Sequence, residues 1–207
     1  ATKGLESKQI QAELIKALDA EGKTSIEAFK VLELEYEVPY LSHAALEPMN
    51  CTANVTENYC EVWVPTQFQG ACMDVAKEVS ELDEEQIKIN TTYLGGGFGR
   101  RGETDFVKQS LILSKELGKP VKVTWMREED MQHGFYRPAS MSRFQIGLNK
   151  DGLPVSWNNQ LASPSILKRF FAPMAWFNVD PLSTEGADEI PYAVEDFNLD
   201  YTEVDSG

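Results

Sequence analysis

Residues Gln86 to Met126 read QIKINTTYLGGGFGRRGETDFVKQSLILSKELGKPVKVTWM, and their pattern is the most informative in this chain. Its apolar residues alternate over 86–94 and recur at helical spacing over 104–117, and a further strand is predicted over 121–126. Four glycines in five positions and then two arginines fill the connection 95–102. The sequence therefore predicts a strand–helix–strand unit whose first connection is a glycine loop.

The rest of the chain is predicted to mix antiparallel hairpins with one or two such units. Helices are predicted over 7–20 and 70–80, and strands over 28–40, 58–64, 143–148, 155–161 and 197–204. The strand over 28–40, in which glutamates alternate with apolar residues, is expected to have one solvent-facing side. This order predicts an α+β fold with mixed sheets. A length of 207 residues suits a single domain over 1–207, with an N-terminal helix and lead-in at 1–26.

The composition excludes several classes of function. Asp and Glu number 33 and Lys and Arg 19, so the formal net charge is −14. Phosphate backbones repel a chain this acidic, and we expect no nucleic acid among its partners. No apolar run approaches the ~20 residues that span a bilayer, and no export signal is recognised at the start of the chain. The three cysteines form no C-x-x-C pair and are predicted to be small buried hydrophobic residues, not ligands of zinc or of an iron–sulfur cluster.

The glycine loop has more than one interpretation from its residues alone. Glycines let a ligand approach the backbone, and the helix start that follows offers free N–H groups to an anion. The charges of Arg100 and Arg101 would strengthen such binding. The segment Gly97–Gly102 also fits the G-x-G-x-x-G pattern of dinucleotide-binding loops, although the acidic residue Glu128 comes later than that pattern expects. The loop Gly95–Gly102 could therefore belong to a non-catalytic dinucleotide- or anion-binding module, or be a tight turn without a ligand.

Further segments accompany the loop. They are PYLSHAALEPMN at 39–50, WVPTQ at 63–67, and REEDM at 127–131 followed by YRP at 136–138. Together with GGGFG at 95–99, and in this order, they resemble the molybdenum hydroxylases, the superfamily of xanthine dehydrogenase and aldehyde oxidase. The resemblance covers 27–207 and is strongest to the branch of large (beta) subunits of isoquinoline 1-oxidoreductases and related aldehyde dehydrogenases. It implies a fold like that of a molybdopterin-binding domain.

The resemblance implies a molybdenum-pterin cofactor and the residues that bind it. These cofactor-binding residues are Gln67, Gly96, Gly97, Phe98, Gly99 and Arg100. The Gln67 amide would donate a hydrogen bond to an oxo ligand of molybdenum, the loop backbone would lie against the metal centre and the pterin, and Phe98 would form an apolar wall. The pterin dithiolene holds the metal in this family, so no metal ligand is expected from the protein. Glu47 is interpreted as structural, and His43 as a hydrogen-bonding residue at a strand end.

The resemblance also implies what the chain lacks. The general base of the family is a glutamate in a Gly-x-Gly-Glu motif, and this sequence contains no such motif. We therefore expect no catalytic residue within this chain, no turnover by the isolated chain, and a longer large subunit of which it is one portion. That subunit would hydroxylate an aldehyde or an N-heteroaromatic substrate with oxygen from water. Electrons would pass to a small subunit that carries two [2Fe–2S] clusters. A bacterial periplasmic or membrane-associated location is implied if the protein is like these relatives, and a cytoplasmic one otherwise.

Two other segments have structural interpretations. The acidic run Arg127–Asp130 is predicted to be a solvated turn or a helix start, not a set of catalytic carboxylates. The aromatic stretch 170–177 is either a docking face for another part of the protein or local core.

Overall fold

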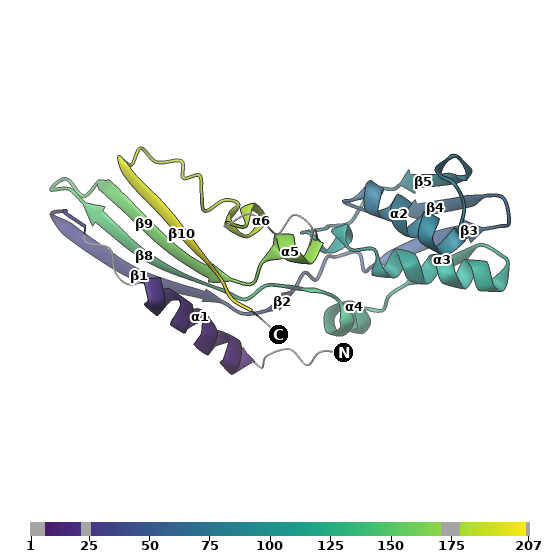
Figure 1. Ribbon diagram of the computed structural model, residues 1–207, viewed down its shortest axis with the longest axis horizontal. Helices are drawn as coiled ribbons and strands as arrows, with labels where there is room; N and C mark the ends of the chain where they lie inside the picture. The colour runs from purple at the N-terminus through teal and green to yellow at the C-terminus, as the bar shows by residue number, and fades with distance from the viewer. Residues whose placement is uncertain (1–6, 22–25, 171–178, 206–207) are drawn as a thin grey trace. The chain divides into compact units, whose positions relative to one another are not determined.

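The chain folds into two compact units. The computed structural model describes residues 7–21, 26–170 and 179–205. Unit 1 is made of residues 1–41 and 138–207, and unit 2 of residues 42–137, so unit 2 is inserted into unit 1 (Figure 1). Each unit has its own sheet and its own buried core. That the two units act together as one functional domain stays a prediction.

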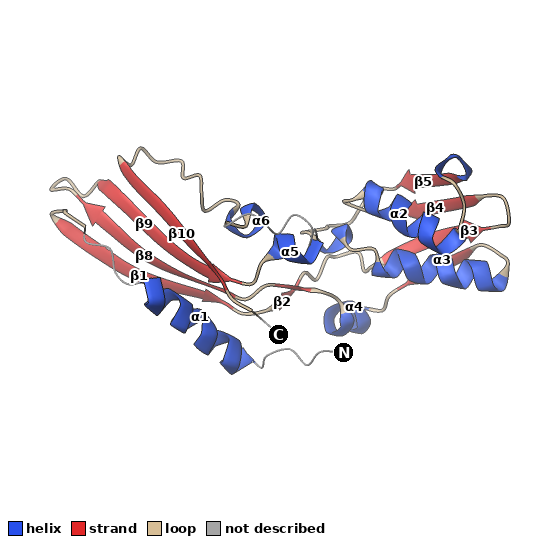
Figure 2. Ribbon diagram, in the orientation of Figure 1, coloured by secondary structure: helices blue, strands red, loops and turns tan. Residues whose placement is uncertain are grey.

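Unit 2 has a four-stranded mixed sheet with two helices packed against it (Figure 2). The strands lie in the order β5-β4-β3-β6, where β3 is Asn50–Val55, β4 is Cys60–Val64, β5 is Ile87–Thr91 and β6 is Val121–Thr124. The parallel pair β4 and β5 is connected through helix α2 (Gln69–Ser80), whereas β3 is antiparallel to both of its neighbours. Helix α3 (Asp105–Leu117) follows the glycine loop and packs against α2, β3 and β6. The predicted strand–helix–strand unit is therefore confirmed.

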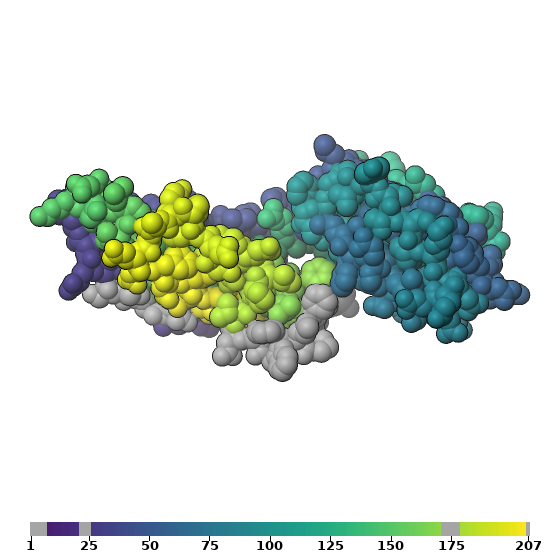
Figure 3. All heavy atoms as spheres, turned by 90° about the horizontal axis from the view of Figure 1, so that it is seen from above, coloured from purple at the N-terminus to yellow at the C-terminus, as the bar shows by residue number. Residues whose placement is uncertain are grey.

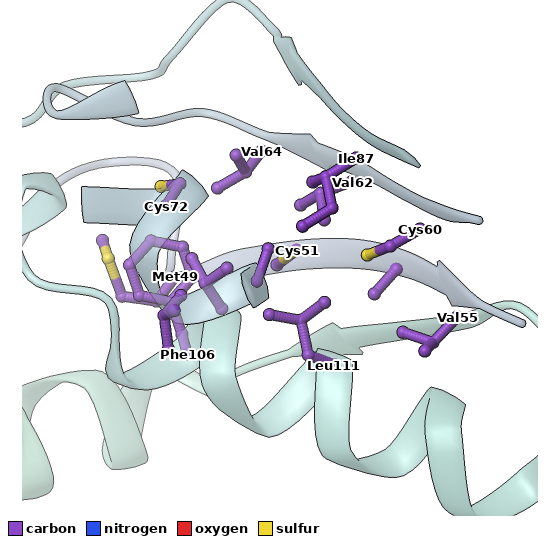
Figure 4. Packing of buried hydrophobic residues seen from close by; sticks show 14 of the residues in the cluster. Met49, Cys51, Val55, Cys60, Val62, Val64, Cys72, Ile87, Phe106 and Leu111 are labelled. Atoms are coloured by element: carbon purple, nitrogen blue, oxygen red, sulfur yellow. The ribbon is translucent and has the colours of Figure 1, made fainter. Parts of the chain in front are cut away.

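The core of unit 2 follows from the alternation of its strands. Every second residue of β3 and of β4 is buried, and these residues form one core cluster with Phe106 and Leu111 of α3, most of which Figure 4 shows. The serines of α3 add hydrogen bonds to this packing. Ser110 Oγ donates to the Cys51 carbonyl, and Ser114 Oγ accepts from the Val55 N–H. These bonds attach α3 to β3, the strand that follows the motif at 39–50.

Unit 1 has a second four-stranded sheet, in the order β1-β8-β9-β10. The strands are β1 (Lys30–Val38), β8 (Ser140–Leu148), β9 (Pro154–Ser163) and β10 (Asp196–Glu203), and only β10 runs parallel to its neighbour. Helix α1 (Ser7–Glu21) buries Ile10, Leu14 and Leu18 against the sheet. Short helices α5 (Ile166–Phe170) and α6 (Pro181–Thr184) lie in the chain between β9 and β10. Figure 3 shows the C-terminal residues, coloured yellow, as a continuous part of the surface of unit 1.

The remaining described elements are short. They are β2 (Leu41–Ser42) and β7 (Tyr136–Arg137), which pair with each other, helix α4 (Arg127–His133), and 3-10 turns at Glu84–Gln86 and Arg100–Gly102. The acidic run after Arg127 thus begins a helix, as predicted. No helix among the described residues is both long and apolar enough to cross a membrane.

Two expectations about strands were wrong in part. Strand β3 was not predicted, because its outward positions are Asn and Thr and its inward ones include the small residues Cys51 and Ala53. Strand β1 was expected to have one buried side, yet only Leu32 is half-buried and the rest is exposed, because helix α1 packs mainly against β8, β9 and β10 and leaves the edge strand β1 largely uncovered. Of the aromatic stretch 170–177, only Phe170 lies within the described residues.

The cysteines provide a direct test of the unit 2 core. Cys51, Cys60 and Cys72 are free and buried, and burial raises the pKa of Cys51 to about 12 and that of Cys60 to about 11. Since the thiolate is the reactive form, we expect none of the three to react with iodoacetamide in the folded protein at mildly alkaline pH. All three should react in denaturant, as counted by mass spectrometry. Labelling of any of them in the folded state would contradict this packing.

Candidate functional site

The glycine loop is a backbone turn held in left-handed conformations. It leaves β5, passes Gly96 with φ 95° and Gly99 with φ 96°, and enters α3 through the 3-10 turn. Phe98 is also left-handed, with φ 55°, and its side chain is 67% exposed. A non-glycine residue pays a steric penalty in this region, of order 1 kcal/mol. An exposed aromatic ring held at such a position is typical of a binding site.

Glu47 attaches one end of the loop to the rest of unit 2. Its backbone N–H donates to the Gly95 carbonyl (3.1 Å), and the Gly95 N–H donates back to its Oε2 (2.8 Å). Asn50 Nδ2 donates to the other carboxylate oxygen. Burial alone would raise the pKa of Glu47, but the hydrogen bonds from Gly95 and Asn50 and the charge of Arg101 hold it below its ordinary value. Glu47 is therefore structural, as the sequence analysis interpreted it.

The side chain of Arg101 is completely buried beneath the loop. Its Nε donates to the Gly96 carbonyl (2.8 Å), and Nη1 donates to that of Pro65 (3.3 Å). Its Nη2 donates to both the carbonyl (2.7 Å) and the carboxylate (2.9 Å) of Glu47. One guanidinium group thus joins the loop to the two segments that flank it.

Arg100 is also directed inward. It makes a bidentate ion pair with Asp105 at the start of α3 (2.9 and 2.8 Å), and the rings of Phe106, Trp125 and Phe135 surround it at 5.3–5.8 Å. The expectation that the two arginine charges attract a ligand was wrong, because desolvation of a guanidinium is offset only when anionic and carbonyl partners stay in contact with it. Any role of Arg100 in cofactor binding is thereby limited to its main chain and stays a prediction.

Gln67 lies against the loop and is oriented by it. The Gly99 N–H donates to its side-chain Oε1 (3.0 Å), and its own backbone N–H donates to the Arg101 carbonyl (3.0 Å). A Cβ atom at Gly97 would meet the amide of Gln67, so a larger residue there would displace this side chain from its place against the loop. With the amide oxygen occupied, the exposed NH2 group is the end available to a ligand.

The loop also has main-chain donors to offer. Within the described part of the chain, no group accepts a hydrogen bond from the N–H of Gly96, Gly97 or Phe98. Beside these donors lie exposed apolar side chains, among them Phe98 and Leu46, the latter 91% exposed. Among residues 7–21, 26–170 and 179–205 there is no cluster of His, Cys, Asp or Glu that could hold a metal ion. The site is therefore suited to bind a polar, partly planar ligand through N–H groups and an apolar wall.

His43 is another side chain that lies beside the loop. It follows β2, and its Nδ1 lies 3.1 Å from the Phe135 carbonyl, which confirms the interpretation as a hydrogen-bonding residue at a strand end. Its other ring nitrogen lies beside Gly99, a position that was not predicted from the sequence. The one sequence feature that could have indicated a role at the loop is its position in the motif 39–50.

A comparison with protein families identifies the kind of domain to which this loop belongs. Residues 8–162 match the family model of the molybdopterin cofactor-binding domain. The chain belongs to this family. Its residues fit the cofactor, because the loop offers unpaired N–H groups and the Gln67 amide, and Gly99 leaves room for a ligand beside them. The resemblance to the molybdenum hydroxylases and the expected molybdenum-pterin cofactor are confirmed.

Individual relatives agree with the family assignment. The chain is 29% identical over 137 residues to a membrane-bound aldehyde dehydrogenase (pyrroloquinoline-quinone) of Gluconacetobacter polyoxogenes, covering 66% of this chain and 18% of that protein. It is 28% identical over 167 residues to isoquinoline 1-oxidoreductase subunit beta of Brevundimonas diminuta, covering 79% of this chain and 21% of that subunit. The chain thus spans about a fifth of the length of these relatives.

A solved structure confirms the fold. The aldehyde oxidoreductase from Desulfovibrio gigas superposes with a TM-score of 0.65 at 16% sequence identity, over 85% of this chain and 19% of that one. The predicted fold class, mixed sheets like those of a molybdopterin-binding domain, is therefore confirmed.

Proposed function

We propose that the loop 95–102 and Gln67 bind the molybdenum-pterin cofactor of a longer oxidoreductase subunit, which hydroxylates an aldehyde or an N-heteroaromatic substrate with oxygen from water. The observation that carries this proposal is the orientation of Gln67. Because the Gly99 N–H occupies its amide oxygen, the NH2 group is left as a neutral donor beside the unpaired N–H groups of the loop. A neutral donor suits an oxo ligand of a metal, since it adds no charge to the centre.

The cofactor, when bound, supplies the oxidising capacity for the hydroxylation. The chain's own residues bind and orient it. Gly96 and Gly97 present main-chain donors at close range, Phe98 forms an apolar wall, and Gln67 donates from its amide. The charged side chains at the loop are engaged elsewhere, Glu47 with Arg101 and Arg100 with Asp105. This pairing supports a binding role for the loop.

The proposal includes partners. The chain would be one portion of a large subunit, with the remainder of that subunit completing the cofactor site. Electrons would pass to a small subunit with [2Fe–2S] clusters. The name of the isoquinoline 1-oxidoreductase relative, a beta subunit, supports a multi-subunit enzyme. The isolated chain, which lacks the Gly-x-Gly-Glu motif, is expected to show no turnover.

The Gln67→Ala variant of the full-length subunit tests the proposal. Loss of a group that donates to a metal's ligand typically costs 10–100-fold, so we expect kcat to fall by about 10–100-fold. Thermal unfolding should change little, because Gln67 is exposed and the protein loses only its hydrogen bond with the Gly99 N–H, worth about 1 kcal/mol. The Gln69→Ala variant, two residues away at the exposed start of α2, should behave as wild type in both measurements.

Other outcomes would identify a different function. Unchanged kinetics in the Gln67→Ala variant would remove Gln67 from the site. If metal analysis and absorption spectra show that the purified subunit contains pyrroloquinoline quinone and no molybdenum, the quinone would be its cofactor and the molybdenum-pterin assignment would be wrong. Tight binding of NAD or NADP that is lost in the Gly99→Val variant would favour the dinucleotide-binding alternative.

A further inference from the structure

The imidazole of His43 is fixed at one nitrogen. Its Nδ1 lies 3.1 Å from the backbone carbonyl of Phe135. A carbonyl oxygen only accepts hydrogen bonds, so Nδ1 must carry the proton of this contact. In the neutral ring the other nitrogen, Nε2, then has a free lone pair and acts as an acceptor. No described residue donates to it.

That second nitrogen borders an open corner of the glycine loop. If Gly99 carried a Cβ atom, His43 Nε2 at 3.8 Å would be its one neighbour within 4 Å among the described atoms outside the adjoining residues. Within this distance, and apart from the adjoining residues, the imidazole of His43 is thus the one described side chain beside Gly99. A ligand that contacts the loop at Gly99 would meet the lone pair of the imidazole.

The backbone on both sides of this corner is strained. Ala44, directly after His43, has φ 44°, and Phe98, directly before Gly99, has φ 55°. Only one other described non-glycine residue has positive φ, Glu81, and it ends helix α2 as a C-cap. The two unexplained strained residues therefore flank the two residues that form the corner. Strain of this kind persists where the surrounding structure holds a functional geometry.

The groups around His43 favour its neutral form. Burial lowers the pKa of His43 from its ordinary value, and the positive charges of Arg100 and Arg137 lower it further. The hydrogen bond to the Phe135 carbonyl and the charge of Asp130 raise it, but the net result is a lowered pKa. Arg100 lies within the same side-chain cluster, because its guanidinium group packs on the Phe135 ring. Although its side chain is buried, Arg100 thus affects the site at the loop, because its positive charge disfavours a second proton on the imidazole of His43.

We propose that Nε2 of His43 is a hydrogen-bond acceptor of the cofactor site, and that it receives an N–H donor of the pterin bound against Gly99. The proposal rests on the function proposed above. It adds a side-chain acceptor to the donors of the loop. A ligand with donors and acceptors side by side, as in a pterin, is thereby distinguished from a simple anion, which has no N–H group to offer.

The tautomer of His43 tests the first half of the proposal. The chain contains two histidines, so long-range ¹H–¹⁵N spectra of the labelled protein show two ring systems, and the His133→Asn variant assigns them. We expect the Nδ1–H tautomer for His43 at neutral pH, with a titration midpoint below the ordinary value of about 6.5. An Nε2–H tautomer, or a ring protonated at neutral pH, would overturn the proposal.

Two substitutions in the full-length, cofactor-loaded subunit test the second half. The His43→Asn variant keeps a donor near the position of Nδ1 for the Phe135 carbonyl but removes the acceptor at Nε2. The His43→Gln variant places an amide near the position of Nε2. We expect loss of the pterin, followed by its fluorescence after release, to be about tenfold faster for His43→Asn, which is the effect of one lost hydrogen bond. The His43→Gln variant should lie closer to wild type.

The outcomes separate the two proposals. If His43→Asn releases the pterin at the wild-type rate, His43 only fixes the strand end and this inference is wrong, while the proposed function stands. If wild-type subunit contains no pterin, the proposed function fails, and the pterin contact of His43 fails with it. Unfolding curves of both variants check that faster release does not follow from a loss of folding.

Discussion

Replacing Arg101 by methionine is expected to destabilise unit 2 by about 2–4 kcal/mol. Breaking a buried ion pair costs about 3–5 kcal/mol because the remaining charge is left without a partner, and we reduce this figure because the Glu47 side chain is 34% exposed. The Arg101→Met substitution also leaves the carbonyls of Gly96, Pro65 and Glu47 without their donor. Methionine fills a similar volume, so the loss measures the polar contacts and not a cavity. Urea unfolding of the two proteins gives the difference.

The matched control is an exposed ion pair of the same unit. Lys108 and Glu78 are in contact, but both side chains are largely exposed, so Lys108→Met should change stability by less than about 1 kcal/mol. The difference between wild type and Arg101→Met should also narrow in acid. The folded-state pKa of Glu47 is depressed, so its contribution is present above the unfolded value and is lost as the pH falls through the folded value. An Arg101→Met protein as stable as the Lys108→Met control would refute the structural role of this arginine.

The Gly95→Ala substitution is expected to release the loop from Glu47. A Cβ atom at this position would stand 2.6 Å from the Cβ of Glu47 and 3.4 Å from its backbone nitrogen. These atoms cannot rotate away as the end of a long side chain can, so one of the two segments must move. The movement breaks the reciprocal bonds between Gly95 and Glu47. We expect a loss of about 1–3 kcal/mol in stability, the range measured for overpacking, and a lower cofactor content of the full-length subunit.

Gly70→Ala is the control for this substitution. Gly70 lies in helix α2, and an added Cβ atom would meet only the Phe68 ring, at 3.5 Å. Since alanine is favoured over glycine inside a helix, this variant should be neutral or more stable by up to about 1 kcal/mol. Metal analysis and unfolding curves on both variants decide the matter. If Gly95→Ala keeps wild-type stability and molybdenum content, the Glu47 contact does not position the loop.

The local elements could be predicted from the sequence, because their causes lie within a few residues of each other. The apolar stripe of α3 and the glycines of its preceding loop depend on short-range spacing, and both are observed. The family could be predicted as well, because its motifs are short and lie in a fixed order. Strand β3 could not, since its hydrophobic signal is weak and its pairing partners β4 and β6 become known only from the sheet.

A glycine loop between a strand and a helix, and its place in a molybdopterin cofactor-binding domain, follow from the residues in their order along the chain. Which groups of that loop are free depends on how the chain folds around it. The tertiary structure buried the two arginines and joined Glu47 to residues 48 and 54 positions away in the chain. It also brought His43 between Phe135 and Gly99. The physical reason is that a charged side chain takes whichever partners repay its desolvation, and those partners lie far along the chain, where sequence spacing carries no information about them.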